Sequence, residues 1–268
     1  MKAARYIEVG QMDELGRLDT PLHRLDARVK MAVVALFVVT VMSFPRYEIS
    51  GLMPLFLFPF VLMSSGNIPS GAILKKVALA LPFALFVGLF NPLLDHSPVL
   101  TLGSWTVSGG WLSLTSILLR FTLTVSAALI LLACTGIYRL CAGLEQIGVP
   151  ALFATQLLFL YRYLFVIGDE ALRMIRSVRM RSAGSKKLSL RTYSTLTGHL
   201  LLRSIDRAQR IYRSMVSRGF AGQIRVLYRT RPGWRDAVFL IGWSAFFILV
   251  RFWNPAAALG GWLTGEHP

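Results

Sequence analysis

Apolar stretches separated by short polar segments make up most of this chain. Five of them are clear: 29–44, 51–63, 77–94, 111–133 and 237–253. A helix needs about 20 mostly apolar residues, within a range of roughly 17 to 25, to cross the hydrocarbon core of a bilayer. The pattern therefore predicts an all-α membrane protein with about five transmembrane helices. The first two stretches are short, so the ends of those helices are not fixed by the pattern.

A sixth apolar stretch, 149–168, is interrupted by Gln156 and Arg162. If it crossed the membrane, the strongly basic segment after it would lie outside, against the rule that cytoplasmic loops are rich in Lys and Arg. We therefore expect this stretch to form a protein-buried or interfacial helix on the cytoplasmic side.

The charges of the loops set the expected orientation. Basic residues precede the first stretch, and Lys75 and Lys76 lie between the second and the third, whereas 95–110 contains no Lys or Arg. The enrichment of cytoplasmic loops in these residues places the N-terminus in the cytoplasm and 95–110 outside. The last span then crosses outward and leaves 266–268 outside.

Positive charge is concentrated in one quarter of the chain. From Glu170 to Arg235 there are 16 Lys and Arg residues and two acids, a net charge of +14 out of the formal +16 of the whole chain. The general bias of membrane proteins and the attraction of anionic headgroups explain such a surplus in part. Contact with partner proteins is the alternative that the next features favour.

Two long helices are predicted around this basic segment, at about 150–181 and 190–217. Pro150 suits a first helical position, and Gly219 is typical of the position just past a helix end. In the second helix, apolar side chains recur at spacings of three and four, which makes the helix amphipathic. These side chains are Leu201, Ile205, Ala208, Tyr212 and Met215.

The chain is thus expected to have three parts. A membrane domain with four spans covers 1–134, and a cytoplasmic or interfacial domain with the two amphipathic helices covers 135–235. The final transmembrane helix and a short external tail form 236–268.

The composition and the motifs of this chain argue against catalysis and against metal or cofactor binding. Charged residues make up 16% of it, compared with about 25% in ordinary soluble domains. It has no phosphate-binding loop of the GxxxxGK[S/T] type, and its four histidines are isolated. Cys134 and Cys141 are seven apart, on roughly one face if helical, and are expected to be buried apolar residues, not metal ligands. We expect no enzymatic activity and no metal or cofactor bound by this chain.

The predicted spans also lack residues that could couple transport to an ion or proton gradient. Acidic residues inside transmembrane helices mark ion or proton pathways, and the first four spans contain none. Arg120 is their one charge at depth; it could be functional, lie near an interface, or pair with Asn91 or Asp95. A transporter of this kind would receive its energy from a partner, through the basic helices.

Several motifs give the chain a family resemblance. They are HRLDARVK at 23–30, LEQIGVP at 144–150, YRY at 161–163, DEA at 169–171, RSIDRAQRIY at 203–212 and MVSRGF at 215–220. In this order they resemble the transmembrane (T) component of energy-coupling-factor (ECF) ABC transporters, in the cobalt-type CbiQ branch. The string at 203–220 is the most specific of them.

The resemblance implies a scaffold in a bacterial inner membrane that joins two ATP-hydrolysing subunits to a substrate-binding membrane subunit, with or without a small accessory subunit. ATP and magnesium would be bound by the partners. In the family, motifs of the type Ala-Arg-Ser/Gly and Ala-Arg-Gly end two coupling helices and dock into the ATPases. The matching positions here are Met180, Arg181 and Ser182, and Ser217, Arg218 and Gly219.

Both alanine positions of these docking motifs differ, and both arginines are kept. The planar guanidinium can bind a carboxylate through two hydrogen bonds and stays charged in a partly buried groove. The same resemblance implies contacts with the substrate-binding subunit along the coupling helices. The positions assigned to these contacts are Leu157, Tyr161, Arg162, Phe165 and Arg207.

Other functions stay open at this level. A T component of a nickel or vitamin importer is the nearest alternative to cobalt uptake. A stand-alone secondary transporter is disfavoured by the lack of intramembrane acids, and a membrane enzyme by the lack of a catalytic pair. Nucleic-acid binding is disfavoured because the arginines lie beside membrane spans, where lipid headgroups and partner subunits compete.

Overall fold

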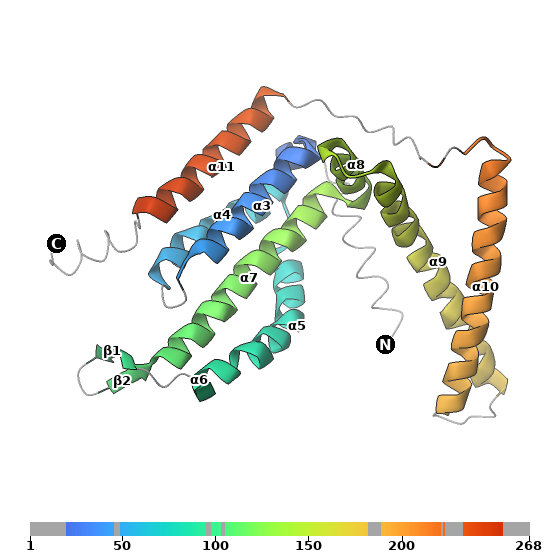
Figure 1. The fold of residues 1–268 in the computed structure, drawn as a ribbon, viewed down its shortest axis with the longest axis horizontal. Coiled ribbons are helices and arrows are strands. Elements are labelled where there is room, and N and C mark those ends of the chain that lie inside the picture. The colour runs from blue at the N-terminus through green and yellow to red at the C-terminus, as the bar shows by residue number, and fades with distance from the viewer. Residues whose placement is uncertain are drawn as a thin grey trace. The chain divides into compact units, whose positions relative to one another are not determined.

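The computed structural model describes residues 20–45, 49–94, 98–102, 105–181, 189–220, 222 and 233–253, and these residues are almost entirely helical (Figure 1). The elements are α2 (Pro21–Arg24), α3 (Ala27–Ser43), the 3₁₀ helix η1 (Ser50–Phe56), α4 (Leu57–Gly66), α5 (Ser70–Gly88), α6 (Phe90–Leu94), β1 (Pro98–Leu102), β2 (Trp105–Ser108), α7 (Gly109–Thr135), α8 (Ile137–Ile147), α9 (Ala151–Arg181), α10 (Leu190–Val216) and α11 (Trp234–Trp253). The all-α membrane fold is confirmed. The antiparallel hairpin β1–β2 was not predicted.

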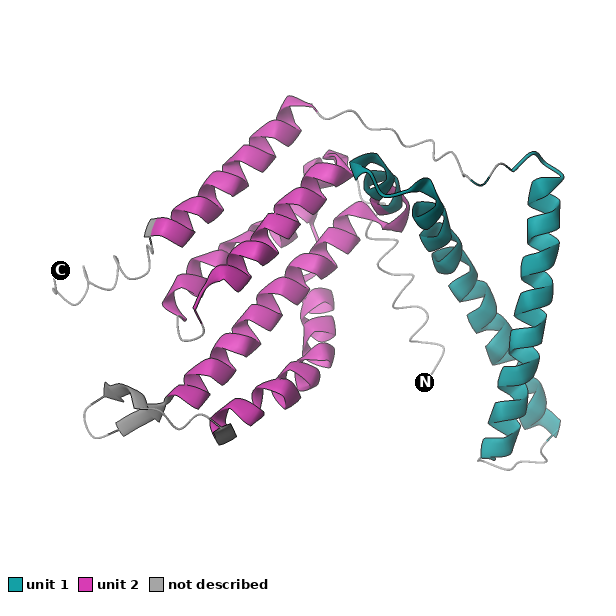
Figure 2. Cartoon of the chain, viewed as in Figure 1, with its two compact units in different colours: residues 1–6, 141–229 teal, residues 7–140, 230–268 magenta. Residues whose placement is uncertain are grey.

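The chain forms two compact units (Figure 2). We call residues 7–140 and 230–268 the membrane unit, and residues 1–6 and 141–229 the helix-pair unit. The last helix, α11, belongs to the same unit as α3, so the two ends of the chain's helical part fold together. The helix-pair unit is inserted between them in the sequence.

Three of the five predicted spans match their helices closely. The stretches 29–44, 111–133 and 237–253 correspond to α3, α7 and α11, with ends that agree within three residues. These stretches are predominantly apolar and free of internal proline, so the hydrophobic pattern was sufficient to find them.

The third predicted span begins earlier than expected. Helix α5 starts at Ser70, and Lys75 and Lys76 therefore lie in its second turn and not in a loop. Lysine is a good helix former, so charge alone does not end a helix. Lys75 is exposed and Lys76 is half-buried.

Two prolines explain the interruption of the second stretch. Pro54 lies inside the 3₁₀ helix η1, which is followed directly by α4. Pro59 falls within the first turn of α4, where its missing N–H is tolerated. Helix α4 then ends at Asn67, which has a left-handed φ of +50° and donates its N–H to the carbonyl of Met63.

Among the residues that the structure describes, three helical segments are long and apolar enough to cross a membrane: Ser70–Pro92, Gly109–Thr135 and Ala151–Arg181. A shorter apolar segment, Ser50–Gly66, accompanies them. Helix α9 thus has the length of a span, whereas the sequence led us to expect its first half at the cytoplasmic side. That placement stays a prediction.

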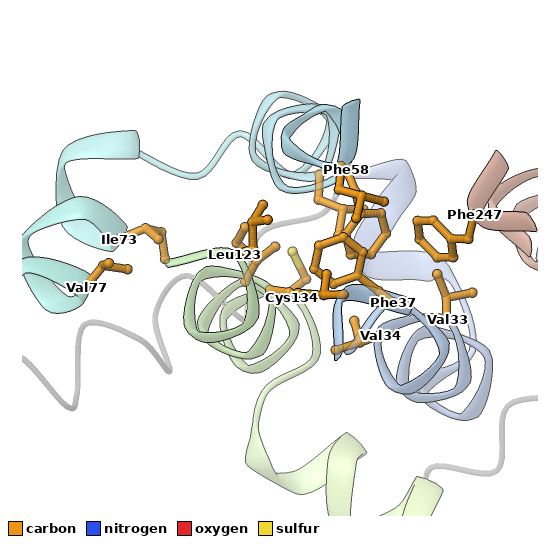
Figure 3. Packing of buried hydrophobic residues seen from close by; sticks show 14 of the residues in the cluster. Val33, Val34, Phe37, Phe58, Ile73, Val77, Leu123, Cys134 and Phe247 are labelled. Atoms are coloured by element: carbon orange, nitrogen blue, oxygen red, sulfur yellow. The ribbon is translucent and has the colours of Figure 1, made fainter. Parts of the chain in front are cut away.

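An aromatic cluster holds the membrane unit together (Figure 3). Phe37 of α3, Phe58 of α4 and Phe247 of α11 are at most 1% exposed. Their ring centres are 4.5 Å apart for Phe37 and Phe58, 5.5 Å for Phe37 and Phe247, and 5.3 Å for Phe58 and Phe247. The indole of Trp243 meets Phe58 edge-on at 4.8 Å. Such tilted and edge-on pairs are favourable aromatic geometries, and here they join the first and last helices.

Asp236 joins the same two helices by hydrogen bonds. Its Oδ2 accepts the N–H of Gly233 at 2.7 Å and so caps α11, while its Oδ1 accepts the N–H of Asp26, at the start of α3, at 2.8 Å. Asp26 in turn accepts the N–H of Arg28. A carboxylate is favoured at a helix N-terminus, and Asp236 occupies two of them at once.

Two basic side chains complete this end of the membrane unit. Lys30 lies near the start of α3 and is 4% exposed. Its Nζ donates to the carbonyl of Cys134 at the end of α7, at 3.2 Å. Arg139 of α8 donates to the carbonyl of His23 at 2.8 Å. The ends of α2, α3, α7 and α11 are therefore tied by polar contacts.

Of the two pairings that we had considered for Arg120, the one with Asn91 is not formed. The Nη2 of Arg120 donates to the carbonyl of Pro45, just past the end of α3, at 2.5 Å. Asn91 instead donates to the hydroxyl of Ser113 at 2.9 Å, and Asp95 lies outside the described residues. A cation at the carbonyl end of a helix is favourable, so the location of Arg120 agrees with its interpretation as a residue near a span end.

The two cysteines do not share one helical face. Cys134 lies in α7 and Cys141 in α8, because Gly136, with a φ of +69°, separates the two helices. Both are buried free thiols, which agrees with their expected role as small apolar residues.

Candidate coupling helices

Local signals fix the starts of the two long helices in the helix-pair unit. Gly148, with a φ of +113°, and Pro150 precede α9. Ser189 precedes α10, and its hydroxyl accepts the N–H of Thr192 at 3.2 Å, which caps the helix. The two predicted helices are confirmed. The shorter helix α8 before them was not predicted.

The end of α10 is a Schellman motif. Gly219 adopts a left-handed φ of +80°. The N–H of Phe220 donates to the carbonyl of Met215, and the N–H of Gly219 donates to that of Val216, both at 3.0 Å. This pair of hydrogen bonds is the usual way in which a glycine ends a helix. Arg218 is therefore the last residue before the chain turns away.

The guanidinium of Arg218 takes no part in this helix end. The last carbonyls are satisfied by backbone N–H groups, and the Arg218 side chain is exposed. Ser217 directs its hydroxyl back to the carbonyl of Arg213, at 2.9 Å. A guanidinium that caps nothing keeps its donors for another molecule.

The C-terminal end of α9 also carries an exposed arginine. Arg181 is its last residue and is exposed, and Met180 beside it is 83% exposed. Ser182, the third residue of this predicted motif, lies outside the described residues. Each long helix thus ends in an exposed arginine.

Glu170 ties the two helices together. Its Oε1 accepts a hydrogen bond from Arg203 of α10 at 2.6 Å, and its Oε2 accepts one from Arg173 at 2.9 Å. The side chain of Glu170 is 16% exposed, while those of both arginines are more than 60% exposed. These bonds, that from Arg203 first, hold the pKa of Glu170 below its ordinary value because they stabilise the carboxylate.

This contact was not predicted from the sequence, in which Glu170 and Arg203 belong to two separate motifs. A signal was present, because Glu170 and Asp206 are the only acids in the segment of net charge +14. A lone acid among so many arginines is a reasonable candidate for an ion pair between helices.

On one side of this ion pair the two helices enclose a groove of about 730 Å³. Its walls are mostly apolar. They include Leu152, Phe159 and Tyr163 of α9 and Ala208, Ile211 and Met215 of α10. Arg207 adds a half-buried charge to this wall.

Helix α10 has no buried residue at all. Of the predicted apolar seam, Ala208, Tyr212 and Met215 line the groove. The other two members, Leu201 and Ile205, are 60% and 45% exposed. The amphipathic helix is confirmed, but a large part of its apolar face has no cover within the described chain.

The five positions assigned to contacts with a partner lie on different sides. Leu157, Tyr161 and Phe165 follow one another at intervals of four along α9, and the rings of the last two meet edge-on at 5.2 Å. Arg162 places its guanidinium 5.9 Å from the ring centre of Tyr163. Arg207 alone among the five lines the groove. The structure therefore does not bring these residues into one patch.

Within the described ranges, no group of three His, Cys, Asp or Glu side chains could hold a metal ion. His199 is exposed on α10. His23 is 1% exposed, with its Nδ1 2.6 Å from the hydroxyl of Thr20.

Comparison with known proteins identifies the family of this chain. The model of the CbiQ family, described as cobalt transport protein, matches residues 19–228. The chain belongs to the CbiQ family. The match includes α2 to α10, so the motifs and the helix pair lie inside the matched region.

Individual relatives differ in the ion that they are named for. The nickel permease LarQ of Lactiplantibacillus plantarum is 30% identical over 170 residues, which are 57% of this chain and 61% of LarQ. The cobalt transport protein CbiQ of Rhodobacter capsulatus is 34% identical over 94 residues, 35% of this chain and 38% of that protein. An uncharacterized protein of Methanocaldococcus jannaschii is 25% identical over 242 residues, 84% of this chain and 80% of that protein.

The matched region spans less than two thirds of LarQ and of the Rhodobacter protein. The family and the apolar helices together make this chain a membrane protein of a transport system.

Proposed function

We propose that this chain is the T component of an ECF-type importer, the membrane subunit that passes motion from ATPases to a substrate-binding subunit. The observation that carries the proposal is the pair of long helices, joined by Glu170 and Arg203, that end in the exposed arginines Arg181 and Arg218. The chain itself is proposed to bind no nucleotide and to catalyse no reaction. It would lie in a bacterial inner membrane with its N-terminus in the cytoplasm.

Each arginine is proposed to dock into one ATP-hydrolysing subunit. An exposed guanidinium offers five donors in a plane, which suits a carboxylate in a groove of the partner. Arg218 is well placed for this role because Gly219 turns the chain away directly behind it. Met180 and Ser217 stand where the family has alanine, so these tips would enter slightly different grooves.

The helices would then transmit movement as a pair. When ATP binding draws the two ATPases together, each would displace the helix tip that it holds. The ion pair of Glu170 and Arg203 keeps the helices crossed, so displacement of the tips changes the width of the apolar groove. The uncovered apolar faces of α9 and α10 would lie against the substrate-binding subunit, which reorients and releases its ion.

A charge reversal at one tip tests the docking role. The change Arg218→Glu is expected to abolish ATP-dependent uptake in reconstituted vesicles and to reduce copurification of the ATPases, because the carboxylate would repel its acidic partner. The matched control is Arg210→Glu, which makes the same change of charge at an exposed position of α10 away from the tip. Normal uptake by the Arg218 variant, or equal loss in the control, would refute the assignment.

The transported substrate is proposed to be a divalent transition-metal ion, with cobalt as the first candidate because of the family description. Nickel is the second candidate, since the relative matched over 57% of this chain is named a nickel permease. Uptake of radioactive cobalt by the assembled complex, in competition with nickel, zinc and a vitamin, separates them. Preferred uptake of the vitamin would place the chain in a different branch of importers.

A further inference from the structure

A second groove opens on the membrane unit, between α2, α4 and the start of α11. It has a volume of about 640 Å³. Apolar side chains from all three helices form most of its wall. They include Leu22, Leu25, Val61, Leu62, Val238 and Phe239.

The mouth of this groove is basic and aromatic. Arg24 and Arg235 line it and are both exposed, and Trp234 beside them is 73% exposed. The guanidinium of Arg235 lies 5.8 Å from the centre of the Trp234 ring. Tryptophan is enriched at membrane–water interfaces, so this mouth has the chemistry of a headgroup region.

Asp236 is the acid among the described residues that line the groove, and it is 7% exposed. Both of its oxygens accept backbone hydrogen bonds, from Gly233 and from Asp26. Its charge is therefore directed at the two helix starts. Among the described lining residues, the exposed charged side chains are Arg24 and Arg235.

The location of the groove in the sequence points to the same leaflet. It lies where α11 begins, directly after the segment of net charge +14, and where α3 begins. Basic segments lie at the cytoplasmic face, whose leaflet carries the anionic lipids.

We propose that this groove binds one anionic phospholipid, with an acyl chain along the apolar wall and the phosphate at Arg24 and Arg235. Basic pockets between transmembrane helices at this face are known to take acidic headgroups. A zwitterionic lipid fits the same wall but carries no net charge for the arginines. The inference is independent of the transported ion and of the ATPase partners.

The experiment compares lipid retention by full-length protein variants. Each is purified in detergent, mixed with equal amounts of phosphatidylglycerol and phosphatidylcholine of the same chain length, and analysed by native mass spectrometry. The wild type is expected to retain phosphatidylglycerol preferentially. The double change Arg24→Gln and Arg235→Gln is expected to lower this preference about thirtyfold, from the contribution of two basic residues near a headgroup.

Two further variants show whether the preference depends on the charge of Arg24 and Arg235, and not on misfolding or on the basic residues of α10. Arg24→Lys with Arg235→Lys keeps both charges and is expected to keep most of the preference. Arg210→Gln with Arg213→Gln removes the same charge from exposed positions of α10 and is expected to leave the preference within twofold. Size-exclusion profiles that match the wild type show that the double Gln variant is folded.

Three results would overturn the proposal. One is an unchanged preference in the Arg24 and Arg235 double Gln variant, or an equal loss in the α10 control. Another is displacement of phosphatidylglycerol by an equal concentration of inorganic phosphate, because the acyl chain would then contribute nothing. The third is a photo-cross-linker at Val61 that reacts with a protein subunit and not with lipid in the assembled complex.

Discussion

The two units of this chain differ in how much of their surface they use for their own folding. In the membrane unit, Phe37, Phe58 and Phe247 are packed to near-complete burial. In the helix-pair unit, α10 runs for 27 residues without one buried side chain. Both units contain long apolar faces, so composition does not explain the difference. The helices of the membrane unit bury a shared core between them, although side chains such as Phe60, Phe83 and Phe252 stay exposed, whereas α10 contributes no buried side chain.

This difference bears on function. A helix whose apolar face is uncovered at rest is stabilised by whatever covers it, so its position responds to a partner. A unit held by buried aromatic rings does not respond in this way, because its packing has one good arrangement. Under the function proposed above, the membrane unit would act as the fixed frame, and the helix-pair unit would supply the surfaces that move against partner subunits.

The largest loss of stability is expected from Asp236→Ala in the frame. The change removes the acceptor of two hydrogen bonds, from Gly233 and from the buried N–H of Asp26. Unsatisfied buried donors cost about 1–3 kcal/mol each, so we expect about 3 kcal/mol in total. Unfolding in mixed micelles measures it. The control Asp206→Ala, at an exposed acid of α10, should change stability by less than about 0.5 kcal/mol.

A smaller loss is expected from Phe58→Ala. In soluble cores this change costs about 3–5 kcal/mol. In a membrane the unfolded state also keeps the ring in an apolar solvent, so mainly the packing contribution is lost, and we expect about 2 kcal/mol. Tyr212→Ala on α10, where the side chain is 63% exposed, should change the same unfolding transition by about 0.5 kcal/mol or less. Equal losses for the two variants would contradict the contrast between the units.

The tip of α10 gives a test within the helix-pair unit. An added Cβ at Gly219 would meet no atom within 4 Å, so the cost of Gly219→Ala comes from the left-handed φ of +80° alone. We expect about 1 kcal/mol of lost helix-end stability, seen as faster hydrogen exchange at residues 216–220. Gly198→Ala in the same helix also meets open space but has no such φ, and it should slow exchange slightly.

The smallest effect is expected from acidification at the helix crossing. Hydrogen bonds from Arg203 and Arg173 lower the pKa of Glu170 below its ordinary value of 4.5. The contribution of this carboxylate is therefore complete above that value and is lost as pH falls through the lower pKa of the folded state. Spin labels on α9 and α10 should show a broader distance distribution at low pH. Glu170→Gln should show the broad distribution at every pH, and a pH response in that variant would assign the effect to another group.

The helices of both units were largely predictable from the sequence, because long apolar stretches and residues that begin or end helices act locally. In the helix-pair unit, Pro150, Ser189 and Gly219 lie at or next to the helix ends that their residue types favour. The features that the sequence did not predict depend on contacts between residues that lie far apart in the sequence. The hydrogen bond from Lys30 to the carbonyl of Cys134 joins residues 104 positions apart. Lys75 and Lys76 were assigned to a loop because charge was taken as a boundary.

The candidate site was predictable in part for the same reason. The two arginine tips follow from motif and helix end, both local signals. The ion pair of Glu170 and Arg203 joins residues 33 positions apart, and no periodicity encodes such a pair. The sides on which Leu157, Tyr161 and Phe165 lie relative to Arg207 depend on how α9 and α10 cross, which the separate helical patterns do not fix.

The hydrogen bond between the N–H of Asp26 and the carboxylate of Asp236 spans 210 residues of sequence. At a synthesis rate of about 5–20 residues per second, the ribosome needs roughly 10 to 40 s to make the intervening chain. During that time α3 lacks the carboxylate of Asp236, which accepts the N–H of Asp26, and the aromatic ring of Phe247. The nascent membrane unit is therefore incompletely packed until α11 has been synthesised. A chaperone that shields the unpaired helix ends would act in that interval.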